Sequence, residues 1–431
     1  TLRPASCAME SAHRRTVALE PRTEFRFETD DGASVSITLV AGAAEVFGAE
    51  MVINRSYSFT DAQQAVFTWR GCTLDVHGPC GHSYVASETP MESYLQLHTD
   101  LEERRARAKA QGTDGPRVLV TGPKETGKSS LCRLLANYRV RHGGSATLVD
   151  LDVSQGVLTP PGCVAAVPLE RPLDIEGSTE DLAPIAYWLG HLSAAEHAGQ
   201  FRRATGALAQ STSERLAADA AARSGGLIIN TSGWVDGAGY ESLLQQIGQF
   251  RADVLVVIGD DRLHSQLSVY VTAPSEPPRV VRKLSKSGGV ISRSAAARSA
   301  AFSSCVREYF YGVAGDLCPH STIHDFDSLQ VSMISVPLQA PMSALPIGAK
   351  LPQDQLAASR VGVAQWPSLM HSILAVVFSD SAKCDDLLRA CVAGYVYVTH
   401  VDMDKQQVTL LAPSPLQMPT AWLLAGSIKW I

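Results

Sequence analysis

The 431-residue sequence lacks several features that would assign it to a secreted or membrane class. Its nine cysteines are scattered, none forms a C-x-x-C pair, and their number is odd. This usage argues against a zinc ribbon or a secreted disulfide scaffold, and it favours a reducing compartment. No apolar run approaches the roughly 18 residues that a membrane span requires. Residues 1–15 contain no apolar core of the kind found in signal peptides. We therefore expect no membrane partner.

The sequence also lacks an excess of basic charge. It has 37 Lys and Arg against 43 Asp and Glu, which gives a formal net charge of −6. No overall positive field attracts nucleic acid, so any RNA must bind at a local basic groove. The hydrophobic fraction of 45% and charged fraction of 19% are ordinary for globular proteins. The length predicts two to four domains.

Residues from about 24 to 86 contain short segments rich in β-formers, with turn residues such as Asp-Asp-Gly between them. Several short strands at close spacing predict a small β-sandwich. A helix should follow, with Thr89 as its N-cap, Pro90 in its first position and Glu92 completing a capping box. We expect the helix to end at Gly112, so the first domain is predicted to span residues 1–112.

From residue 116 onward, apolar strands alternate with helical segments. This pattern predicts an α/β fold with a parallel sheet covered on both faces, in a domain spanning residues 113–315. The remaining residues, 316–431, mix strands with a helix or two and predict a smaller C-terminal α/β domain. The expected strands of the central sheet are residues 117–122, 147–152, 225–230, 252–259 and 279–284.

The clearest motif is a phosphate-binding loop, "GPKETGKS", which begins at Gly122 and ends at Ser129. An apolar strand precedes it and a helix follows it, which argues against a chance match in a flexible turn. Its backbone N–H groups and the helix N-terminus would surround phosphates. Lys128 should reach the β- and γ-phosphates of ATP, and the Ser129 hydroxyl should hold Mg²⁺. The predicted cofactor contacts in the loop are Gly122, Glu125, Thr126, Gly127, Lys128, Ser129 and Ser130.

A second group of polar residues lies in "DLDVSQG", where the predicted strand 147–152 ends. Strand carboxyl ends in such sheets face the ligand crevice. Asp150 and Asp152 are two residues apart, so both could lie on one face of the strand. One of them could hold the water shell of Mg²⁺ or take a proton from an attacking hydroxyl, which Gln155 could position. Alternatively, a strand-end Asp caps the next turn.

Two further segments can supply ligand contacts. Trp234 follows the strand "GGLIIN" and could stack on a nucleic-acid base, or it could pack under its own loop.

Arg293 and Arg298 follow a Gly-Gly pair at 288–289, which could let the segment move as a lid that delivers charge to a phosphate. The alternative is two arginines on a solvated helix. Their spacing of five weakens a simple clamp, because it does not place them on one helix face.

Taken together, these stretches resemble the Clp1-type polyribonucleotide 5′-hydroxyl kinases of the pre-mRNA cleavage complex, which are related to the Grc and NOL types of polynucleotide kinase. The resemblance covers nearly the whole chain. It rests on long matches in the same order: "AAEVFG", "AVFTWRGC", "ETPMESYL", "GPRVLVTGPKETGKSSLCRLL", "LDVSQG", "INTSGWVDGAGY", "SKSGGVISRS" and "REYFYG". It implies a β-sandwich, a central P-loop kinase domain and a C-terminal α/β domain.

The resemblance also implies a reaction and its residues. The family transfers the γ-phosphate of ATP to a 5′-hydroxyl of RNA, and in many members of DNA. By its pattern Lys128 and Ser129 carry ATP and Mg²⁺, and Asp152 activates the hydroxyl. Trp234 then stacks on the base, and Arg293 and Arg298 are the lid arginines. From the first domain, Glu24 contacts the nucleotide, and Gln63 lies where relatives often have a lysine.

Two departures from the family pattern leave a second function open. Ser154 replaces a usual glycine. The segment after Gly190, which usually contains Ser or Thr with a proline and clasps the RNA end, reads "GHLSAAEH" and keeps only Ser193. The chain could instead be an ATP-bound scaffold of the 3′-end cleavage complex. A small-metabolite kinase or GTPase fits less well, because no Asn-Lys-x-Asp motif is present.

By resemblance the expected partners are other cleavage-complex subunits and the tRNA-splicing endonuclease, and the expected location is the nucleus.

Overall fold

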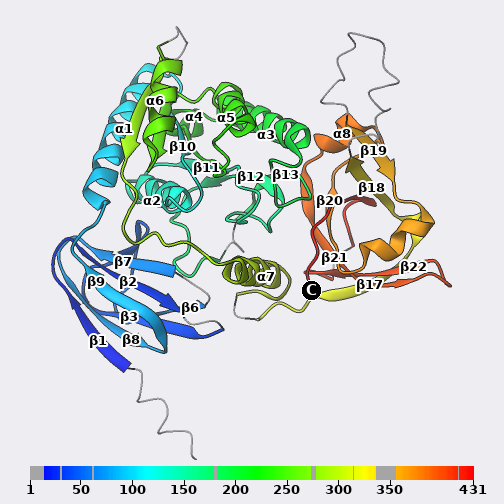
Figure 1. The fold of residues 1–431 in the computed structure, drawn as a ribbon, viewed down its shortest axis with the longest axis horizontal. Coiled ribbons are helices and arrows are strands. Elements are labelled where there is room, and N and C mark those ends of the chain that lie inside the picture. The colour runs from blue at the N-terminus through cyan, green and yellow to red at the C-terminus, as the bar shows by residue number, and fades with distance from the viewer. Residues whose placement is uncertain are drawn as a thin grey trace, which may run out of the picture.

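The computed structural model describes residues 14–29, 32–60, 63–178, 182–272, 278–313, 315–335, 356–415 and 417–431. These residues form a β-sandwich, a central α/β unit and a C-terminal sheet, with the central unit between the other two (Figure 1). Among the described residues, no helix is both long enough and apolar enough to cross a membrane.

The N-terminal unit is a sandwich of two antiparallel sheets. Side chains of both sheets meet in one core, for example Phe25 and Val66 from one sheet with Ile37 and Leu74 from the other. The sandwich expected from the sequence is therefore confirmed. One sheet contains β1 (Arg14–Leu19), β8 (Cys72–His77), β3 (Ser34–Gly42) and β6 (Ser56–Thr60); the other contains β5 (Ala49–Glu50), β4 (Glu45–Val46), β7 (Gln63–Thr68), β2 (Thr23–Thr29) and β9 (Cys80–Ala86).

Helix α1 (Met91–Gln111) joins the sandwich to the central unit and ends, as expected, at a left-handed Gly112. Its start differs from the prediction: Pro90, rather than Thr89, occupies the N-cap position, and the Thr89 hydroxyl accepts the Met91 N–H at 3.4 Å. The predicted capping box is wrong because Thr89 is not the N-cap and Glu92 pairs elsewhere. The Thr89 hydroxyl donates to Glu24 at 3.2 Å, and Glu92 pairs with Arg22 at 3.0 Å.

The central sheet has seven strands in the order β13-β12-β11-β14-β10-β15-β16. The five predicted strands are present and parallel: β10 (Arg117–Thr121), β11 (Ala146–Asp150), β14 (Leu227–Asn230), β15 (Val254–Ile258) and β16 (Val280–Leu284). Two antiparallel strands, β12 (Cys163–Leu169) and β13 (Ile185–Trp188), extend the sheet beyond β11 and were not foreseen.

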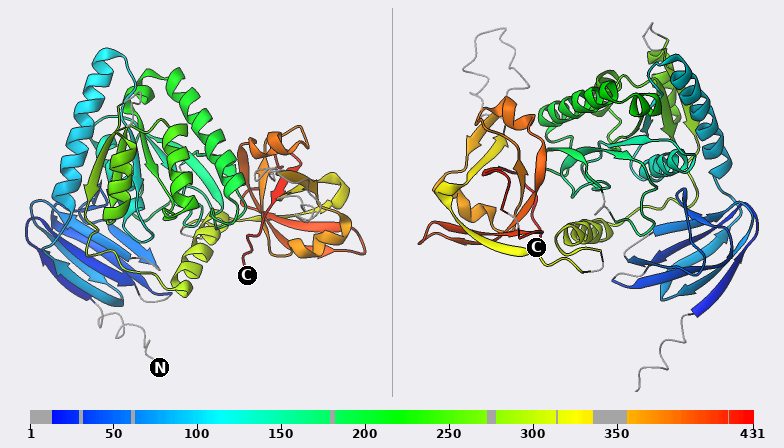
Figure 2. Two further views of the ribbon diagram at one scale, coloured as in Figure 1. Left: turned by 45° about the horizontal axis from the view of Figure 1, so that its top comes forward. Right: turned by 180° about the vertical axis from the view of Figure 1, so that it is seen from behind.

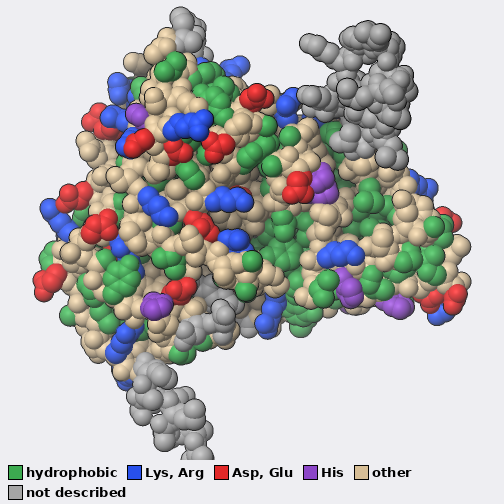
Figure 3. Space-filling view, viewed as in Figure 1, with side chains coloured by type: hydrophobic (Ala, Val, Ile, Leu, Met, Phe, Trp, Pro, Cys, Tyr) green, Lys and Arg blue, Asp and Glu red, His purple; other side chains and the backbone are tan. Residues whose placement is uncertain are grey.

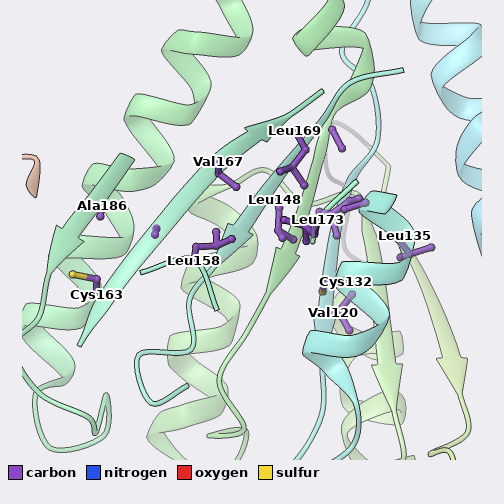
Figure 4. Packing of buried hydrophobic residues seen from close by; sticks show 14 of the residues in the cluster. Val120, Cys132, Leu135, Leu148, Leu158, Cys163, Val167, Leu169, Leu173 and Ala186 are labelled. Atoms are coloured by element: carbon purple, nitrogen blue, oxygen red, sulfur yellow. The ribbon is translucent and has the colours of Figure 1, made fainter. Parts of the chain in front are cut away.

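Helices cover both faces of this sheet because its strands are apolar on both sides. Successive residues of β10 point to opposite faces: Val118 and Val120 belong to one buried cluster, and Leu119 belongs to another. Figure 4 shows part of the first cluster, with Leu148 and Val167 on neighbouring strands. The first face is covered by α1 and α2 (Lys128–Arg141); the second by α3 (Ala198–Ala218), α5 (Ala238–Gln249) and α6 (Asp261–Tyr270).

Residues 213–224 are divided between two helices. The end of α3 and the short α4 (Ala220–Gly225) are separated at Asp219, which is extended. The Asp219 carboxylate accepts the Ala221 backbone N–H at 2.8 Å, so the side chain caps α4 and ends α3. Helix α6 was not foreseen.

The C-terminal unit is a seven-stranded mixed sheet in the order β17-β22-β21-β20-β23-β18-β19. Its described helical content is small: one α-helix of five residues, α8 (Cys384–Leu388), and two 3-10 segments, η2 (Phe326–Ser328) and η4 (Val363–Leu369). The strands are β17 (His320–Asp325), β18 (Gln330–Ser335), β19 (Ala357–Arg360), β20 (Ile373–Val377), β21 (Val392–Asp402), β22 (Gln407–Ala412) and β23 (Trp422–Ala425).

The C-terminal sheet shares its core with the central unit. One buried cluster runs from α2 and β12 to β20 and β21, and helix α7 (Ala295–Tyr311) contributes Phe310 to it. The Cys163 thiol lies 2.9 Å from the Tyr395 hydroxyl, and the rings of Trp188 and Tyr395 are 5.7 Å apart. In both views of Figure 2, α7 lies below the central unit and beside the C-terminal unit. The relative position of the units is therefore fixed by a packed interface.

Basic and acidic side chains are interspersed over the described part of the face in Figure 3. This mixture agrees with the small net charge of the sequence.

We predict that Leu135→Ala destabilises the protein by about 3 kcal/mol, because Leu135 is fully buried in the shared cluster and its truncation leaves a cavity. Val269→Ala is the control, since that side chain is 70% exposed on α6 and should change stability by less than about 0.5 kcal/mol. Urea titration of both variants measures the difference. Equal midpoints would contradict the assignment of Leu135 to the core.

Candidate functional site

The phosphate-binding motif forms the turn between β10 and α2. Gly122 follows β10 with φ 149°, and Gly127 is the left-handed N-cap of α2. A Cβ atom at Gly122 would lie 2.5 Å from the Ile258 carbonyl oxygen, so only glycine fits between the loop and β15. The loop therefore curls beside the α2 N-terminus, whose free N–H groups favour an anion.

Lys128 is buried in this turn, with 5% of its surface exposed. Its Nζ donates to the Pro123 carbonyl at 2.7 Å, and the Thr126 hydroxyl donates to the same oxygen at 3.0 Å. Burial lowers the pKa of Lys128, while the charge of Asp152 opposes that shift. The ammonium is thus held within the loop and close to the carboxylate.

Asp152 lies just beyond β11, and its carboxylate is oriented by its own loop. One oxygen accepts the Ser154 hydroxyl at 2.6 Å, and the other accepts the Gln155 amide at 3.0 Å. Ser154, which departs from the family's glycine, therefore has a specific contact. These bonds fix the carboxylate at the wall of a cavity that Lys128 and Gln155 also line.

Asp150 has a different environment from Asp152. It lies at the end of β11, where its carboxyl accepts the Asp152 N–H at 3.0 Å and the Asn230 amide at 2.9 Å. Burial, followed by the charge of Asp152, raises the pKa of Asp150 to about 7. Asp150 is not among the cavity-lining residues, so of the two carboxylates only Asp152 faces the ligand space.

The Ser129 hydroxyl lies at the same edge of the sheet. The Asn230 amide nitrogen donates to it at 3.2 Å, and the Asn230 Oδ1 atom is buried without a partner among the described residues. Hard cations such as Mg²⁺ prefer oxygen ligands. The Ser129 hydroxyl and the Asp152 carboxylate supply such oxygens, so these residues fit the ion that the motif implies.

The two arginines predicted to belong to a lid, Arg293 and Arg298, both contact one residue of the loop. Glu125, a non-glycine residue with φ 57°, accepts the Arg293 backbone N–H at 2.9 Å and the Arg298 guanidinium at 3.2 Å. The Arg293 N–H, then the Ser292 side chain, lower the pKa of Glu125. The two arginines do not share a helix, because Arg293 precedes the Ser294 N-cap and only Arg298 lies on α7, and their action as a clamp on a phosphate remains a prediction.

The sandwich contributes Glu24 and Gln63. The Glu24 carboxylate is buried, accepts the Arg26 guanidinium at 2.6 Å, and accepts the Thr89 hydroxyl. Burial raises the pKa of Glu24, and Arg26 opposes this. The Gln63 amide oxygen lies 3.4 Å from Arg293 Nε, so the sandwich touches the lid directly. Both predicted residues line the cavity, and their contact with nucleotide remains a prediction.

One cavity of about 1730 Å³ brings these residues together. Every site residue predicted from the sequence lines it except Gly122, the first residue of the loop. Trp234 and Ser193 lie in its wall together with the loop. Sequence reasoning assigned no role to several lining residues, of which Lys124 lies within the phosphate loop itself: Arg26, Tyr84, Tyr94, Lys124, His191, His197, Ser427 and Lys429.

This fold and site define a P-loop nucleotide-binding protein with two flanking domains, and family profiles match all three parts. "N-terminal beta-sandwich domain of polyadenylation factor" matches residues 18–108, and "mRNA cleavage and polyadenylation factor CLP1 P-loop" matches residues 122–312. "Pre-mRNA cleavage complex II protein Clp1" matches residues 317–431. The chain belongs to the Clp1 family.

Individual relatives agree over nearly the full length. The chain is 38% identical to the Protein CLP1 homolog of Arabidopsis thaliana over 429 residues, covering 98% of this chain and 95% of the relative. It is 38% identical to the Polyribonucleotide 5′-hydroxyl-kinase Clp1 of Gallus gallus, covering 96% of each. A solved structure of wild-type Clp1p with Pcf11p has the same fold, with a TM-score of 0.82 at 20% identity, covering 96% of this chain and 98% of that one.

We predict that Gly122→Ala weakens ATP binding by tenfold or more, about 1.4 kcal/mol, because the added Cβ must displace the loop from the Ile258 carbonyl. Gly248→Ala is the matched control, since no atom lies within 4 Å of the Cβ position there. Calorimetric titration with ATP measures both. Unchanged affinity in Gly122→Ala would show that the loop does not hold the nucleotide.

Proposed function

We propose that this protein is an ATP-dependent polynucleotide 5′-hydroxyl kinase and a component of the mRNA 3′-end cleavage and polyadenylation machinery. The observation that carries the proposal is the meeting of Lys128, Asp152 and Trp234 in one cavity. A phosphate-binding loop, a carboxylate and an aromatic ring are what phosphoryl transfer to a nucleic-acid end requires. Relatives that carry the name polyribonucleotide 5′-hydroxyl-kinase support the same reaction.

ATP would lie with its phosphates on the backbone of residues 122–130. The Lys128 ammonium now donates to the Pro123 carbonyl, which belongs to the same loop. With ATP bound, it would donate to the β- and γ-phosphates instead. Ser129 and Asp152 would hold Mg²⁺. The ion, when bound, neutralises charge on the phosphate oxygens. Glu24 and Gln63 would contact the nucleotide from the sandwich side.

The carboxylate of Asp152 is the group that accepts the proton of the 5′-hydroxyl. The hydroxyl oxygen then bonds to the γ-phosphorus while the bond from that phosphorus to the bridging oxygen of ADP breaks. Arg293 and Arg298 both donate hydrogen bonds to Glu125. They stabilise charge on the transferring phosphoryl group. The acceptor would be held by Trp234 stacking on its terminal base, worth about 1–3 kcal/mol, and by Gln155 and Ser193.

A second candidate function is an ATP-bound scaffold subunit with little or no transfer activity. Glu24 and Gln63 line the same cavity as the loop, so bound nucleotide would tie the sandwich to the central unit. The segment after Gly190 lacks the family's proline, which weakens the expected clasp on RNA.

The partners and location are also part of the proposal. The structure of a fold relative with Pcf11p supports binding to another cleavage-complex subunit. We propose the nucleus as the location, and the tRNA-splicing endonuclease as a further partner.

We predict that Asp152→Asn lowers the turnover number for phosphate transfer to a 5′-hydroxyl RNA by about 10²-fold or more, because the amide accepts no proton. ATP should still bind, since the loop is intact. Asp380→Asn, an exposed residue outside the cavity wall, is the control. The result that would remove Asp152 from this role is full turnover in Asp152→Asn.

Lys128→Ala separates the kinase from the scaffold. With labelled ATP and a short 5′-hydroxyl RNA, we expect the wild-type protein to label the RNA and Lys128→Ala to abolish labelling, because Lys128 is the cation at the transferring phosphate. ATP that co-purifies in equal amount with the wild-type chain, without any labelled RNA, would contradict the kinase and support the scaffold.

A further inference from the structure

The last six residues of the chain leave the C-terminal sheet after β23 and reach the catalytic cavity. Ser427, Ile428 and Lys429 line it together with Lys128, Asp152 and Trp234 from the central unit. The views in Figures 1 and 2 agree that the chain end lies beside α7. None of the sequence motifs lies in these six residues, so the motifs did not predict this placement.

The tail is anchored along its length. The Ser427 N–H donates to the Gly190 carbonyl at 2.8 Å, and the Trp430 N–H donates to the His371 carbonyl at 2.9 Å. A Cβ atom at Gly426 would lie 2.0 Å from the Gly190 oxygen, so the two glycines permit an approach that no larger residue allows. The tail is therefore fixed against residues 190–197, the segment that differs from the family's clasp.

Two histidines of that segment stack against each other at the same place. The rings of His191 and His197 have centroids 3.4 Å apart and planes within 9°. His191 Nδ1 lies 2.7 Å from the Ser427 hydroxyl oxygen, which joins the histidine pair to the tail. Burial lowers the pKa of His191 to about 4 and also lowers that of His197, and Glu196 opposes both shifts. The lowered pKa values favour the neutral, hydrogen-bonding form of both rings.

Lys429 supplies the positive charge. In the tail Ser427 and Lys429 are exposed, while Ile428 between them is buried, so both polar side chains face away from the core. Among the described residues, no carboxylate pairs with Lys429. The cation is available to an anion in the cavity.

We propose that His191, His197, Ser427 and Lys429, the tail subsite, bind a backbone phosphate of the polynucleotide just beyond the 5′-terminal nucleotide. A phosphodiester carries one negative charge and oxygens that accept from an ammonium, a hydroxyl and an imidazole N–H, which are the groups gathered here. The ATP phosphates have their own site at the loop. The inference rests on the proposed kinase function. It adds a contact that favours a polynucleotide acceptor over a nucleoside, because a nucleoside has no backbone phosphate.

The position of the subsite favours the acceptor over ATP. The sandwich, with Glu24 and Gln63, closes the cavity beside the lid, whereas the tail comes from the C-terminal unit on the other side of the central unit (Figure 1). A strand whose first base stacks on Trp234 would pass residues 191–197 as it leaves. Glu196 is the carboxylate that this segment adds to the cavity wall, and it should repel the same phosphate.

The test is the affinity of the full-length protein, saturated with a non-hydrolysable ATP analogue, for a 3′-labelled 5′-hydroxyl RNA decamer, measured by fluorescence anisotropy. Losing one phosphate contact on a single strand removes about 0.7 from the slope of log affinity against log salt, which is about fivefold in affinity at 0.1 M salt. We expect this change in Lys429→Ala, rescue by Lys429→Arg, and tighter binding in Glu196→Gln.

The controls separate the subsite from the fold and from the catalytic step. Lys405→Ala changes an exposed lysine of the same unit outside the cavity wall and should bind RNA normally. ATP affinity should be unchanged in Lys429→Ala, and adenosine should be bound equally by wild type and variant.

Lys429→Ala with the affinity and salt slope of the wild type would overturn the inference. An equal loss of ATP affinity in that variant would also overturn it, by showing a structural role for the tail. If the wild type binds RNA through Lys429 but transfers no phosphate, the subsite stands and the kinase proposal fails.

Discussion

The whole site depends on the tight turn between β10 and α2, where Gly122 lies against the Ile258 carbonyl and α2 begins at Lys128. This turn places a cation and free backbone N–H groups at the carboxyl edge of the parallel sheet. The strand order β11-β14-β10 then sets the neighbours. Asp152 follows β11 and Trp234 follows β14, so the carboxylate and the aromatic ring come to the same edge.

The flanking units complete a cavity that the central sheet cannot close alone. The sandwich reaches the lid through Gln63 and Arg293, and the C-terminal tail reaches residues 190–197 through Ser427 and Gly190. A continuous buried cluster from α1 through the sheet to β21 holds the central and C-terminal units together. The acceptor and the nucleotide would thus be held by different units at fixed separation, which is how positioning contributes to phosphoryl transfer.

Local patterns predicted the parts of this fold that local chemistry determines. The five parallel strands are apolar runs long enough to be recognised, and the phosphate loop is defined by contiguous residues. The antiparallel β12 and β13 were missed because no helix separates them from β11. The capping box failed because Glu92 pairs with Arg22, which is distant in sequence, instead of reaching back to the start of α1. The tail beside residues 190–197 was missed for the same reason: its place depends on a tertiary contact between glycines.

The most direct test of the account is a structure of the protein with a non-hydrolysable ATP analogue and a short 5′-hydroxyl RNA. The measured quantity is the distance from the Asp152 carboxylate to the RNA 5′-oxygen, with the analogue's terminal phosphate on Lys128. The account predicts a hydrogen-bond distance of about 2.6–3.2 Å. An analogue bound away from residues 122–130, or an RNA end remote from Asp152 with both ligands in place, would contradict it.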